Sequence, residues 1–312
     1  MSQPKIICAG EALIDLVSTE YADDFRSADT YRRYPGGSPT NLAMNLALLG
    51  CEVGLLASLG EDAAGSLLRE ALEARGVDVS AVARRSQPTT AILVTRSRAV
   101  SAFEAYRAAD AIIEPTQIPA GYLSGCRVFH TTAFALSRLP ARQTIMSCAA
   151  EVVAAGGRLS IDANYAANIW PDRSEALRVI DSYLALGVTG VHGTLVKVSE
   201  VDFHRLFGGE VSDPIAAVQA VLDRGAGVVC LTMGEGGAYV SSGGKVDHLP
   251  VRKVEVRDTT GAGDAFWSGF LAAHLAGRPW IDCMRAGRSV AERKLTQVGP
   301  LEEPMELAAL LR

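Results

Sequence analysis

The chain has 312 residues, of which 48% are hydrophobic, enough to bury a large core. Acidic residues number 35 against 30 Lys and Arg, which gives a formal net charge of −5. The sequence has no basic run, and this argues against nucleic acid or an anionic membrane as a partner. Charged residues interrupt the first apolar segment before any signal-peptide cleavage site, and no stretch approaches the ~18 apolar residues of a membrane helix. We therefore expect a soluble, cytoplasmic protein.

The cysteines and histidines predict no site of their own. The 6 cysteines are scattered without C-x-x-C spacing and fall mostly in apolar segments, which predicts reduced core thiols and argues against disulfides or zinc. The 5 histidines form no H-x-x-x-H pair, so each is interpreted as a core or surface residue.

Apolar runs typical of buried strands alternate along the chain with apolar residues at helical spacing. The expected strands are residues 6–9, 53–58, 128–130, 159–162, 194–198 and 228–232. The expected helices are residues 41–49, 64–75, 141–155, 173–186, 215–224, 262–276 and 281–295. This alternation predicts one α/β domain over residues 1–312, with a mostly parallel sheet covered by helices on both faces. Ligands of such a sheet bind outside the carboxyl ends of the strands.

Two segments, near residues 17–35 and 89–107, break the alternation. The first is polar and the second has the pattern of a strand, a turn and a strand. Without further information, a pair of edge hairpins accounts for both.

Residues 258–266, D-T-T-G-A-G-D-A-F, place a glycine-rich turn and a carboxylate at the start of a helix. The first N–H groups of a helix lack partners, and with the positive end of the helix dipole they favour anionic oxygens. Gly261 and Gly263, on either side of Ala262, let a ligand approach the backbone closely. The Asp264 carboxylate would repel a bound phosphate, so we expect it to accept a proton from an incoming hydroxyl. A helix cap with a tight turn is the alternative interpretation.

A second glycine motif, G-G-S-P-T-N, occupies residues 36–41. Gly36 and Gly37 allow a turn pressed against a ligand, and Asn41 offers both a donor and an acceptor to a polyol. A Gly-Gly turn followed by an Asn cap is the structural alternative. Upstream, a buried strand runs into G-E-A-L-I-D, which places Asp15 where that first strand emerges.

Together these motifs resemble the signatures of the ribokinase-like, or PfkB, carbohydrate kinases. The residues of the G-E-A-L-I-D and G-G-S-P-T-N motifs are similar to those of the fructokinase branch in particular. The resemblance implies that Asp264 is the catalytic base and that the backbone of Gly261, Ala262 and Gly263 receives charge from the transferring phosphoryl group. It also implies that Asp15 binds sugar hydroxyls. Segments 17–35 and 89–107, which break the alternation, would then form a small β-sheet lid over the sugar. A homodimer could form through this lid.

Two further segments extend the resemblance on the sugar side. Residues 103–110, F-E-A-Y-R-A-A-D, are similar to a fructokinase-branch segment that places an arginine near the sugar, which nominates Arg107. Residues 159–170 resemble a strand end followed by D-x-N, which places Asp162 and Asn164 at the mouth of the sheet. Many relatives have an arginine soon after that asparagine, where this chain has two alanines.

The nucleotide side shows weaker matches. Residues 197–202, K-V-S-E-V-D, begin with Lys197 and fall where the family has an N-x-x-E motif that helps hold magnesium through water. Ser199 and Asp202 are the matching positions, and Asp keeps the hard oxygen that magnesium prefers. A helix cap with an exposed acid is the alternative interpretation. The other candidate is the strand-following loop T-M-G-E-G-G, which resembles the loop that lines the nucleotide phosphates or is an ordinary hairpin turn; it contributes Thr232, Gly234 and Gly237.

The resemblance also implies a potassium site, in which the residue matching Asp258 and carbonyls from an alanine-rich helix bind the ion. In this chain the corresponding helix is unusually charged. Its charged residues are Arg288, Glu292, Arg293 and Lys294.

The sequence thus predicts an ATP- and magnesium-dependent sugar kinase with D-fructose as the favoured acceptor. Kinases of 2-keto-3-deoxygluconate, ribose or a nucleoside would keep the chemistry and change the pocket. A non-enzymatic sugar sensor would be expected to lack the base or the anion hole. The chain has no Walker P-loop and no protein-kinase H-R-D, and no G-x-G-x-x-G follows the first strand as a nicotinamide dehydrogenase would need.

Overall fold

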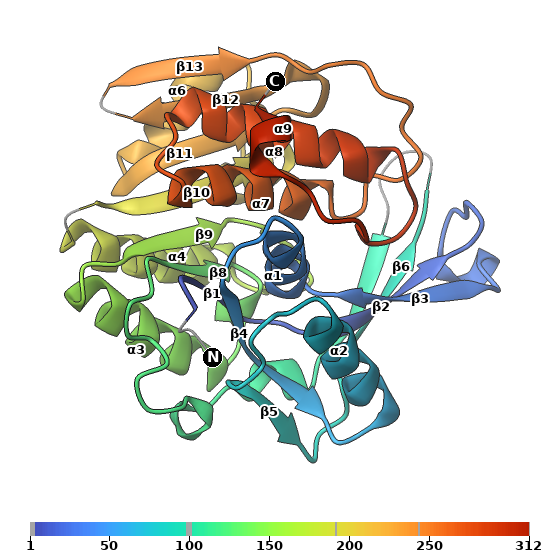
Figure 1. Ribbon diagram of the computed structural model, residues 1–312. Helices are drawn as coiled ribbons and strands as arrows, with labels where there is room; N and C mark the ends of the chain where they lie inside the picture. Colours follow the sequence, from blue (N-terminus) through green and yellow to red (C-terminus); the bar gives the residue numbers. More distant parts are fainter. Residues whose placement is uncertain (1–3, 98–101, 191, 243, 312) are drawn as a thin grey trace.

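The computed structural model describes residues 4–97, 102–190, 192–242 and 244–311. In this part of the chain, nine strands form one sheet in the order β13-β12-β11-β10-β9-β8-β1-β4-β5 (Figure 1). The strands from β11 to β5 are parallel, and β12 and β13 form an antiparallel hairpin at one edge. Their bounds are β1 Ile6–Ala9, β4 Val53–Gly60, β5 Val82–Arg85, β8 Val128–Thr132, β9 Arg158–Asp162, β10 Thr194–Ser199, β11 Ala226–Thr232, β12 Ala238–Ser242 and β13 Lys245–Leu249.

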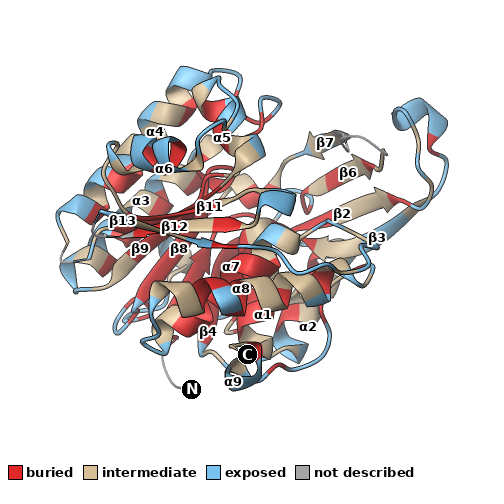
Figure 2. Cartoon of the chain, turned by 90° about the horizontal axis from the view of Figure 1, so that it is seen from above, coloured by how far each residue is buried: buried red, intermediate tan, exposed pale blue. Residues whose placement is uncertain are grey.

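Helices cover both faces of this sheet (Figure 2). One face carries α3 (Ala141–Ala154), α4 (Arg173–Val188), α5 (Glu200–Phe207) and α6 (Pro214–Leu222). The other carries α1 (Ser38–Leu48), α2 (Ala63–Ala74), α7 (Ala262–Leu275), α8 (Trp280–Leu295) and the short α9 (Leu307–Leu310). Short 3-10 turns occur at Phe25–Ser27, Ala109–Ala111, Pro115–Gln117, Ala135–Ser137 and Gly234–Gly236. The expected fold class, a mostly parallel sheet between two helical layers, is confirmed.

The core lies on both sides of the large sheet, because successive side chains of a strand point to opposite faces. In β1, Ile6 and Cys8 belong to the apolar cluster on the α1 and α7 side, whereas Ile7 and Ala9 belong to the cluster on the α3 and α4 side. All four residues are fully buried.

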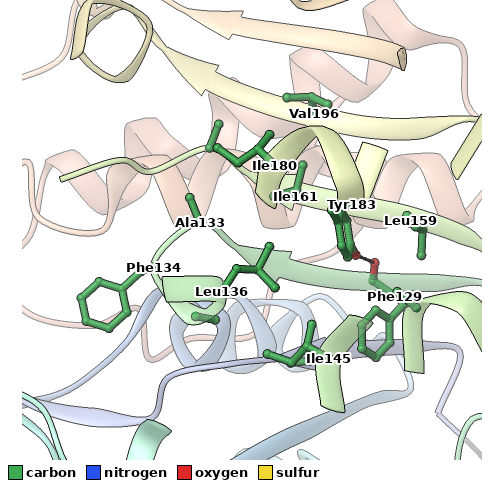
Figure 3. Close-up of a cluster of buried hydrophobic side chains, with 14 of the residues drawn as sticks. Phe129, Ala133, Phe134, Leu136, Ile145, Leu159, Ile161, Ile180, Tyr183 and Val196 are labelled. Atoms are coloured by element: carbon green, nitrogen blue, oxygen red, sulfur yellow. Dashed lines mark hydrogen bonds between the residues drawn. The ribbon is translucent and has the colours of Figure 1, made fainter. Parts of the chain in front are cut away.

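Figure 3 shows part of the second cluster, where Phe129, Leu159 and Ile161 pack against residues of α3 and α4. The Tyr183 hydroxyl of α4 donates a hydrogen bond to the Phe129 carbonyl oxygen at 3.3 Å. The helices are therefore fixed to the sheet by apolar packing and by satisfied polar groups.

A second, four-stranded sheet projects from one end of the molecule (Figure 1, Figure 2). Its order is β3 (Tyr31–Gly36), β2 (Leu13–Ser18), β6 (Ala91–Thr95) and β7 (Ala102–Tyr106). Strands β2 and β6 pair in parallel and the other pairs are antiparallel. The expected strand, turn and strand near residues 89–107 is confirmed as β6 and β7.

The structure corrects the expected place of Asp15. Strand β1 ends at Ala9, the chain turns at Gly10 with φ +148°, and Asp15 lies in β2 of the small sheet. There it pairs with Tyr34 of β3 and Ile92 of β6. Asp15 was expected near the end of the first strand, but the chain changes sheet between Ala9 and Leu13, and the sequence pattern does not reveal that change.

Other expected elements are found with small differences at their ends. Strand β4 continues to Gly60, and α1 begins at Ser38 because Gly37 takes the N-cap position and a proline follows within the first turn. Helix α9 was not expected, and α5 was expected only in the alternative interpretation of residues 199–202 as a helix cap; both helices are short. All 6 cysteines are free, with Cys51 half-buried and the rest buried.

None of the helices in the described ranges is long and apolar enough to cross a membrane.

Candidate active site

Residues near the N-terminal end of the chain donate hydrogen bonds to both oxygens of the Asp264 carboxylate. Asp264 is in the first turn of α7, and the Ser38 hydroxyl donates a hydrogen bond to its Oδ1 at 2.6 Å. The Asn41 Nδ2 donates to the other oxygen, Oδ2, at 2.9 Å. Both partners belong to the first turn of α1. Two helix N-termini therefore meet at one carboxylate whose orientation is fixed.

The electrostatic setting of Asp264 suits a general base. Burial and the negative charge of Asp162 raise its pKa, and the hydrogen bonds from Ser38 and Asn41 and the charge of Lys197 oppose the rise, so that the pKa is about 6. A base with a pKa near the working pH is ionised and still able to hold a proton in the transition state.

Of the three backbone donors expected in the loop before Asp264, two are free in the described structure. The Ala262 N–H donates to the Thr259 carbonyl oxygen at 3.2 Å, so a tight turn already uses it. The N–H groups of Gly261 and Gly263 have no hydrogen-bond partner within the described ranges. Gly261 also needs to be glycine, because it has φ +75° as the N-cap of α7. These two donors at a helix N-terminus form the candidate anion hole.

The glycines of the G-G-S-P-T-N motif bring the small sheet against α1. A Cβ on Gly36 would lie 2.1 Å from Asp15 Oδ2, and a Cβ on Gly37, which has φ +97°, would lie 2.3 Å from the Glu11 carbonyl oxygen. Burial and the negative charge of Asp264 raise the pKa of Asp15 to about 7. Asp15 lines one cavity with Asn41, the residue that donates to Asp264, so the two carboxylates belong to one site.

Lys197 and Asp162 form a buried ion pair beneath the anion hole. Lys197 Nζ lies 2.7 Å from Asp162 Oδ2, and the two side chains are 5% and 4% exposed. Burial alone would lower the pKa of Lys197, but the nearby carboxylates outweigh it and the pKa is raised. A Cβ on Gly263 would lie 3.1 Å from Lys197 Nζ. Asp162 Oδ1 is buried without a hydrogen-bond partner among the described residues, which leaves it for a ligand.

Arg107 and Asn164 both support the loop that follows β8. The Arg107 guanidinium pairs with Asp110 at 2.6 Å and lies over the Phe134 ring, 4.2 Å from its centroid. Asn164 Oδ1 accepts a hydrogen bond from the Phe134 N–H at 3.1 Å. Their direct contact with a sugar stays a prediction.

Ser199 and Asp202 lie at the start of α5. Ser199 is the N-cap, accepts a hydrogen bond from the Asp202 N–H at 3.0 Å and donates one to Asp202 Oδ2. This is the cap of the alternative interpretation, although Asp202 is half-buried and not exposed. Burial raises the pKa of Asp202 to about 6, against the positive charge of Lys197.

The carboxylates of Asp162 and Asp202 are hard oxygen donors of the kind that magnesium prefers, so the residues present fit this ion. Within the described ranges, however, no three His, Cys, Asp or Glu side chains form a group that could hold a metal alone. Phosphate and water oxygens would have to complete the coordination of a bound magnesium ion.

The loop containing Thr232, Gly234 and Gly237 joins β11 to β12. Thr232 ends β11, and the Met233 N–H donates to the Gly237 carbonyl oxygen at 2.8 Å. Gly237 has φ +85°, and a Cβ there would lie 2.3 Å from the Leu249 carbonyl oxygen. The hairpin turn accounts for these glycines, so the contact with nucleotide phosphates stays a prediction.

Asp258 is paired with a lysine. Its Oδ1 accepts a hydrogen bond from the Thr260 N–H at 3.0 Å, and its Oδ2 lies 3.3 Å from Lys294 Nζ. Burial alone would raise the pKa of Asp258, but these two partners lower it below its usual value. A potassium ion does not fit beside this carboxylate, because an ammonium group already holds it.

A cavity of about 180 Å³ lies between the small sheet and the loops at the starts of α1 and α7. Asp15, Asn41 and Gly261 line it together with Lys294. Two arginines of the small-sheet region, Arg32 and Arg96, also line it.

Sequence reasoning missed Ser38 and Glu11. Glu11 is buried, and it accepts hydrogen bonds from the Thr132 hydroxyl at 2.9 Å and the Ser38 N–H at 3.2 Å. Burial raises its pKa to about 8, against the hydrogen bond from Thr132 and the charge of Arg107. The sequence offered a reason to consider each of these two residues. Glu11 is a lone charge next to an apolar strand, and Ser38 lies within the motif itself.

A family model, curated relatives and solved structures resemble this chain. The family model described as pfkB family carbohydrate kinase matches residues 3–306. An ATP-dependent 6-phosphofructokinase of Thermoanaerobacterium thermosaccharolyticum is 33% identical over 296 residues, which are 95% of this chain and 89% of the relative. A fructokinase of Klebsiella pneumoniae is 29% identical over 277 residues, 87% of this chain and 85% of the relative. The solved fructokinase of Halothermothrix orenii superposes with a TM-score of 0.79 at 30% identity, covering 95% of this chain and all of that one.

Proposed function

Since this chain belongs to the pfkB family of carbohydrate kinases, we propose that it transfers the γ-phosphoryl group of ATP to a hydroxyl of D-fructose. The observation that carries the proposal is the Asp264 carboxylate, oriented by Ser38 and Asn41 beside the free N–H groups of Gly261 and Gly263. A base next to an anion hole is the arrangement that phosphoryl transfer to an alcohol requires.

In the proposed reaction, Asp264 accepts the proton of the sugar hydroxyl as the sugar oxygen forms its bond to the γ-phosphorus. The bond from that phosphorus to the bridging oxygen breaks, and ADP leaves with the electron pair. The Gly261 and Gly263 N–H groups, with Lys197 below them, stabilise negative charge on the transferring group. Bound magnesium would neutralise phosphate charge, and Asp162 and Asp202 are the carboxylates placed to hold it through water.

The sugar would lie between the large sheet and the small one, with Asp15 and Asn41 bonding its hydroxyls. Asp15 supports this placement because it lies on the small sheet and lines one cavity with Asn41. The small sheet then acts as the lid over the sugar. Fructose is favoured because fructokinases recur among the relatives and solved structures that resemble the chain.

A second candidate acceptor is fructose 6-phosphate. One relative, at 33% identity, is a 6-phosphofructokinase. In addition, Arg32 and Arg96 line the cavity next to Asp15, and neither has a carboxylate partner within the described ranges. Two guanidinium groups would suit the phosphate of a phosphorylated sugar.

A coupled assay with ATP and magnesium across D-fructose, fructose 6-phosphate, ribose, 2-keto-3-deoxygluconate and adenosine tests the proposal. We expect the highest kcat/KM with D-fructose. A higher value with fructose 6-phosphate would select the second candidate, and failure of every sugar would refute the kinase assignment.

Arg96→Gln separates the first two acceptors. If the substrate is fructose 6-phosphate, this variant should raise its KM about 10-fold or more, the scale of one lost charged hydrogen bond. If the substrate is fructose, its KM should change little. Arg33→Gln is the matched control, because Arg33 is an exposed arginine of the same sheet outside the cavity lining.

A further inference from the structure

Lys294 is a buried lysine, which is rare unless the ammonium has a partner. It lies in the last turn of α8 and is 5% exposed as a residue. Its Nζ is 3.3 Å from Asp258 Oδ2, and the two side chains are 7% and 13% exposed. The last turn of a helix carries the negative end of the dipole, so this position also favours a cation.

The lysine lies directly behind the anion-hole loop. A Cβ on Gly261 would be 3.7 Å from Lys294 Cε, so the lysine stem packs against the residue that supplies one of the two free donors. Asp258 begins the same loop and also accepts the Thr260 N–H. The ammonium therefore places a fixed positive charge at the base of a loop that receives negative charge during the reaction.

We propose that Lys294 acts as a built-in cation, fixing and polarising the anion-hole loop through Asp258, so that the enzyme needs no bound potassium ion. This inference rests on the proposed phosphoryl transfer. A monovalent cation at Asp258 would meet the ammonium group at the same oxygen, and two like charges within a few ångströms repel strongly in a buried site. The residues present thus exclude a second cation where this one already lies.

Lys294 lines the same cavity as Asp15, but it is a positioning residue in this scheme, because its ammonium group acts through Asp258 and not on the reacting atoms. A merely structural ion pair would affect stability without any response to added cations. The two roles are separated by variants that differ in the space they leave. Lys294→Ala opens room for an exogenous cation beside Asp258, and Lys294→Met removes the charge while filling most of the room.

The first arm of the experiment is kinetic, at constant ionic strength, in potassium chloride or tetramethylammonium chloride. We expect the wild-type kcat to agree within about 2-fold between the two salts. Lys294→Ala should lose about 10-fold or more in kcat in tetramethylammonium, with little change in the sugar KM, and recover in potassium or ammonium. Lys294→Met should show the same loss without recovery. Arg293→Met, an exposed neighbour in the same turn, is the control and should behave as the wild type.

The second arm measures melting temperatures without sugar or ATP, so its outcome does not depend on the acceptor. Potassium should raise the melting temperature of Lys294→Ala relative to tetramethylammonium by a few degrees, because a ligand that binds the folded state stabilises it. The wild type should show no such difference.

Potassium-specific activation of the wild type, or full activity of Lys294→Ala in tetramethylammonium, would overturn the inference. If Lys294→Ala does not fold, the wild-type comparison between the two salts and the kcat of Lys294→Met decide it. Absence of turnover with every sugar would instead count against the proposed function, and the melting arm would still test the cation site.

Discussion

The two sheets of this molecule differ in how completely they are packed. Every residue of β4 in the nine-stranded sheet is buried, whereas β3 in the four-stranded sheet buries only Gly36. The groups proposed for the chemistry, Asp264 and the anion-hole loop, lie on helix termini of the fully packed body. Asp15 is the site carboxylate carried by the small sheet. The difference teaches that the groups proposed to need fixed geometry lie on the closely packed body, while Asp15, proposed to bind the substrate, lies on the less packed sheet.

The difference in packing between the two sheets should affect stability, and this is the largest effect that we expect. Ile161→Ala, in β9 of the large sheet, should lower the free energy of unfolding by about 2–5 kcal/mol, because the surrounding side chains cannot fill the cavity. Val94→Ala, in β6 of the small sheet, should cost about 1 kcal/mol, because Val94 is only partly buried. Urea denaturation of both variants measures the two values. Equal losses would show that the sheets are packed alike.

A change of base on the rigid body should act on turnover alone. Asp264→Asn removes the proton acceptor and should lower kcat by about 100-fold or more, the scale of a lost general base. Sugar affinity, measured by calorimetry, should be retained because the helix terminus stays in place. A kcat within a few-fold of the wild type would remove Asp264 from the mechanism.

A change on the small sheet should act on affinity instead. Asp15→Ala should raise the KM of the sugar about 10- to 100-fold, since one or two hydrogen bonds to a charged group are lost, and leave the KM of ATP within about 3-fold. Arg33→Gln, on the paired strand β3, serves as the control. If Asp15→Ala lowers the melting temperature while both KM values hold, Asp15 has only a structural role in the sheet.

The smallest expected effect is a shift of the pH profile. The ionised carboxylate is the base, so activity should fall as the pH drops through the Asp264 pKa of about 6. The Ser38 hydrogen bond stabilises the ionised form and lowers that pKa. Ser38→Ala should therefore raise it, moving the acidic limb of the kcat profile to higher pH by about one unit. An unchanged limb would mean that another group sets it.

The sequence alone predicted most strands of the large sheet, because the central strands are continuous apolar runs. Strand β1 has the expected bounds, and β9 and β10 each differ by one residue at one end. The sequence did not predict the change of sheet between Ala9 and Leu13, which moves Asp15 from the expected end of the first strand into β2 of the small sheet. Helix α5 was not among the helices expected from apolar spacing, because eight residues give too short a pattern.

The candidate site divides in the same way. The two glycine motifs predicted Asp264, Asn41 and the glycines as site residues, because the local patterns of these motifs are specific. The partner of Asp258 could not be predicted, since Lys294 lies 36 residues away and its neighbours in sequence are also charged. The Ala262 N–H could not be excluded from the anion hole by sequence, because its bond to the Thr259 carbonyl oxygen depends on the turn that the loop adopts. No residue type specifies that turn.

The hydrogen bond between Ser38 and Asp264 joins residues 226 positions apart, and this separation bears on how the protein is made. During synthesis, α1 leaves the ribosome long before α7 is made. The polar first turn of α1 is therefore exposed without the Asp264 carboxylate to which it later donates hydrogen bonds. Strand β1 likewise waits for β8 before it is enclosed between β4 and β8. A nascent chain that stops short of α7 therefore lacks Asp264, and the proposed site forms only when the last part of the chain folds onto the first.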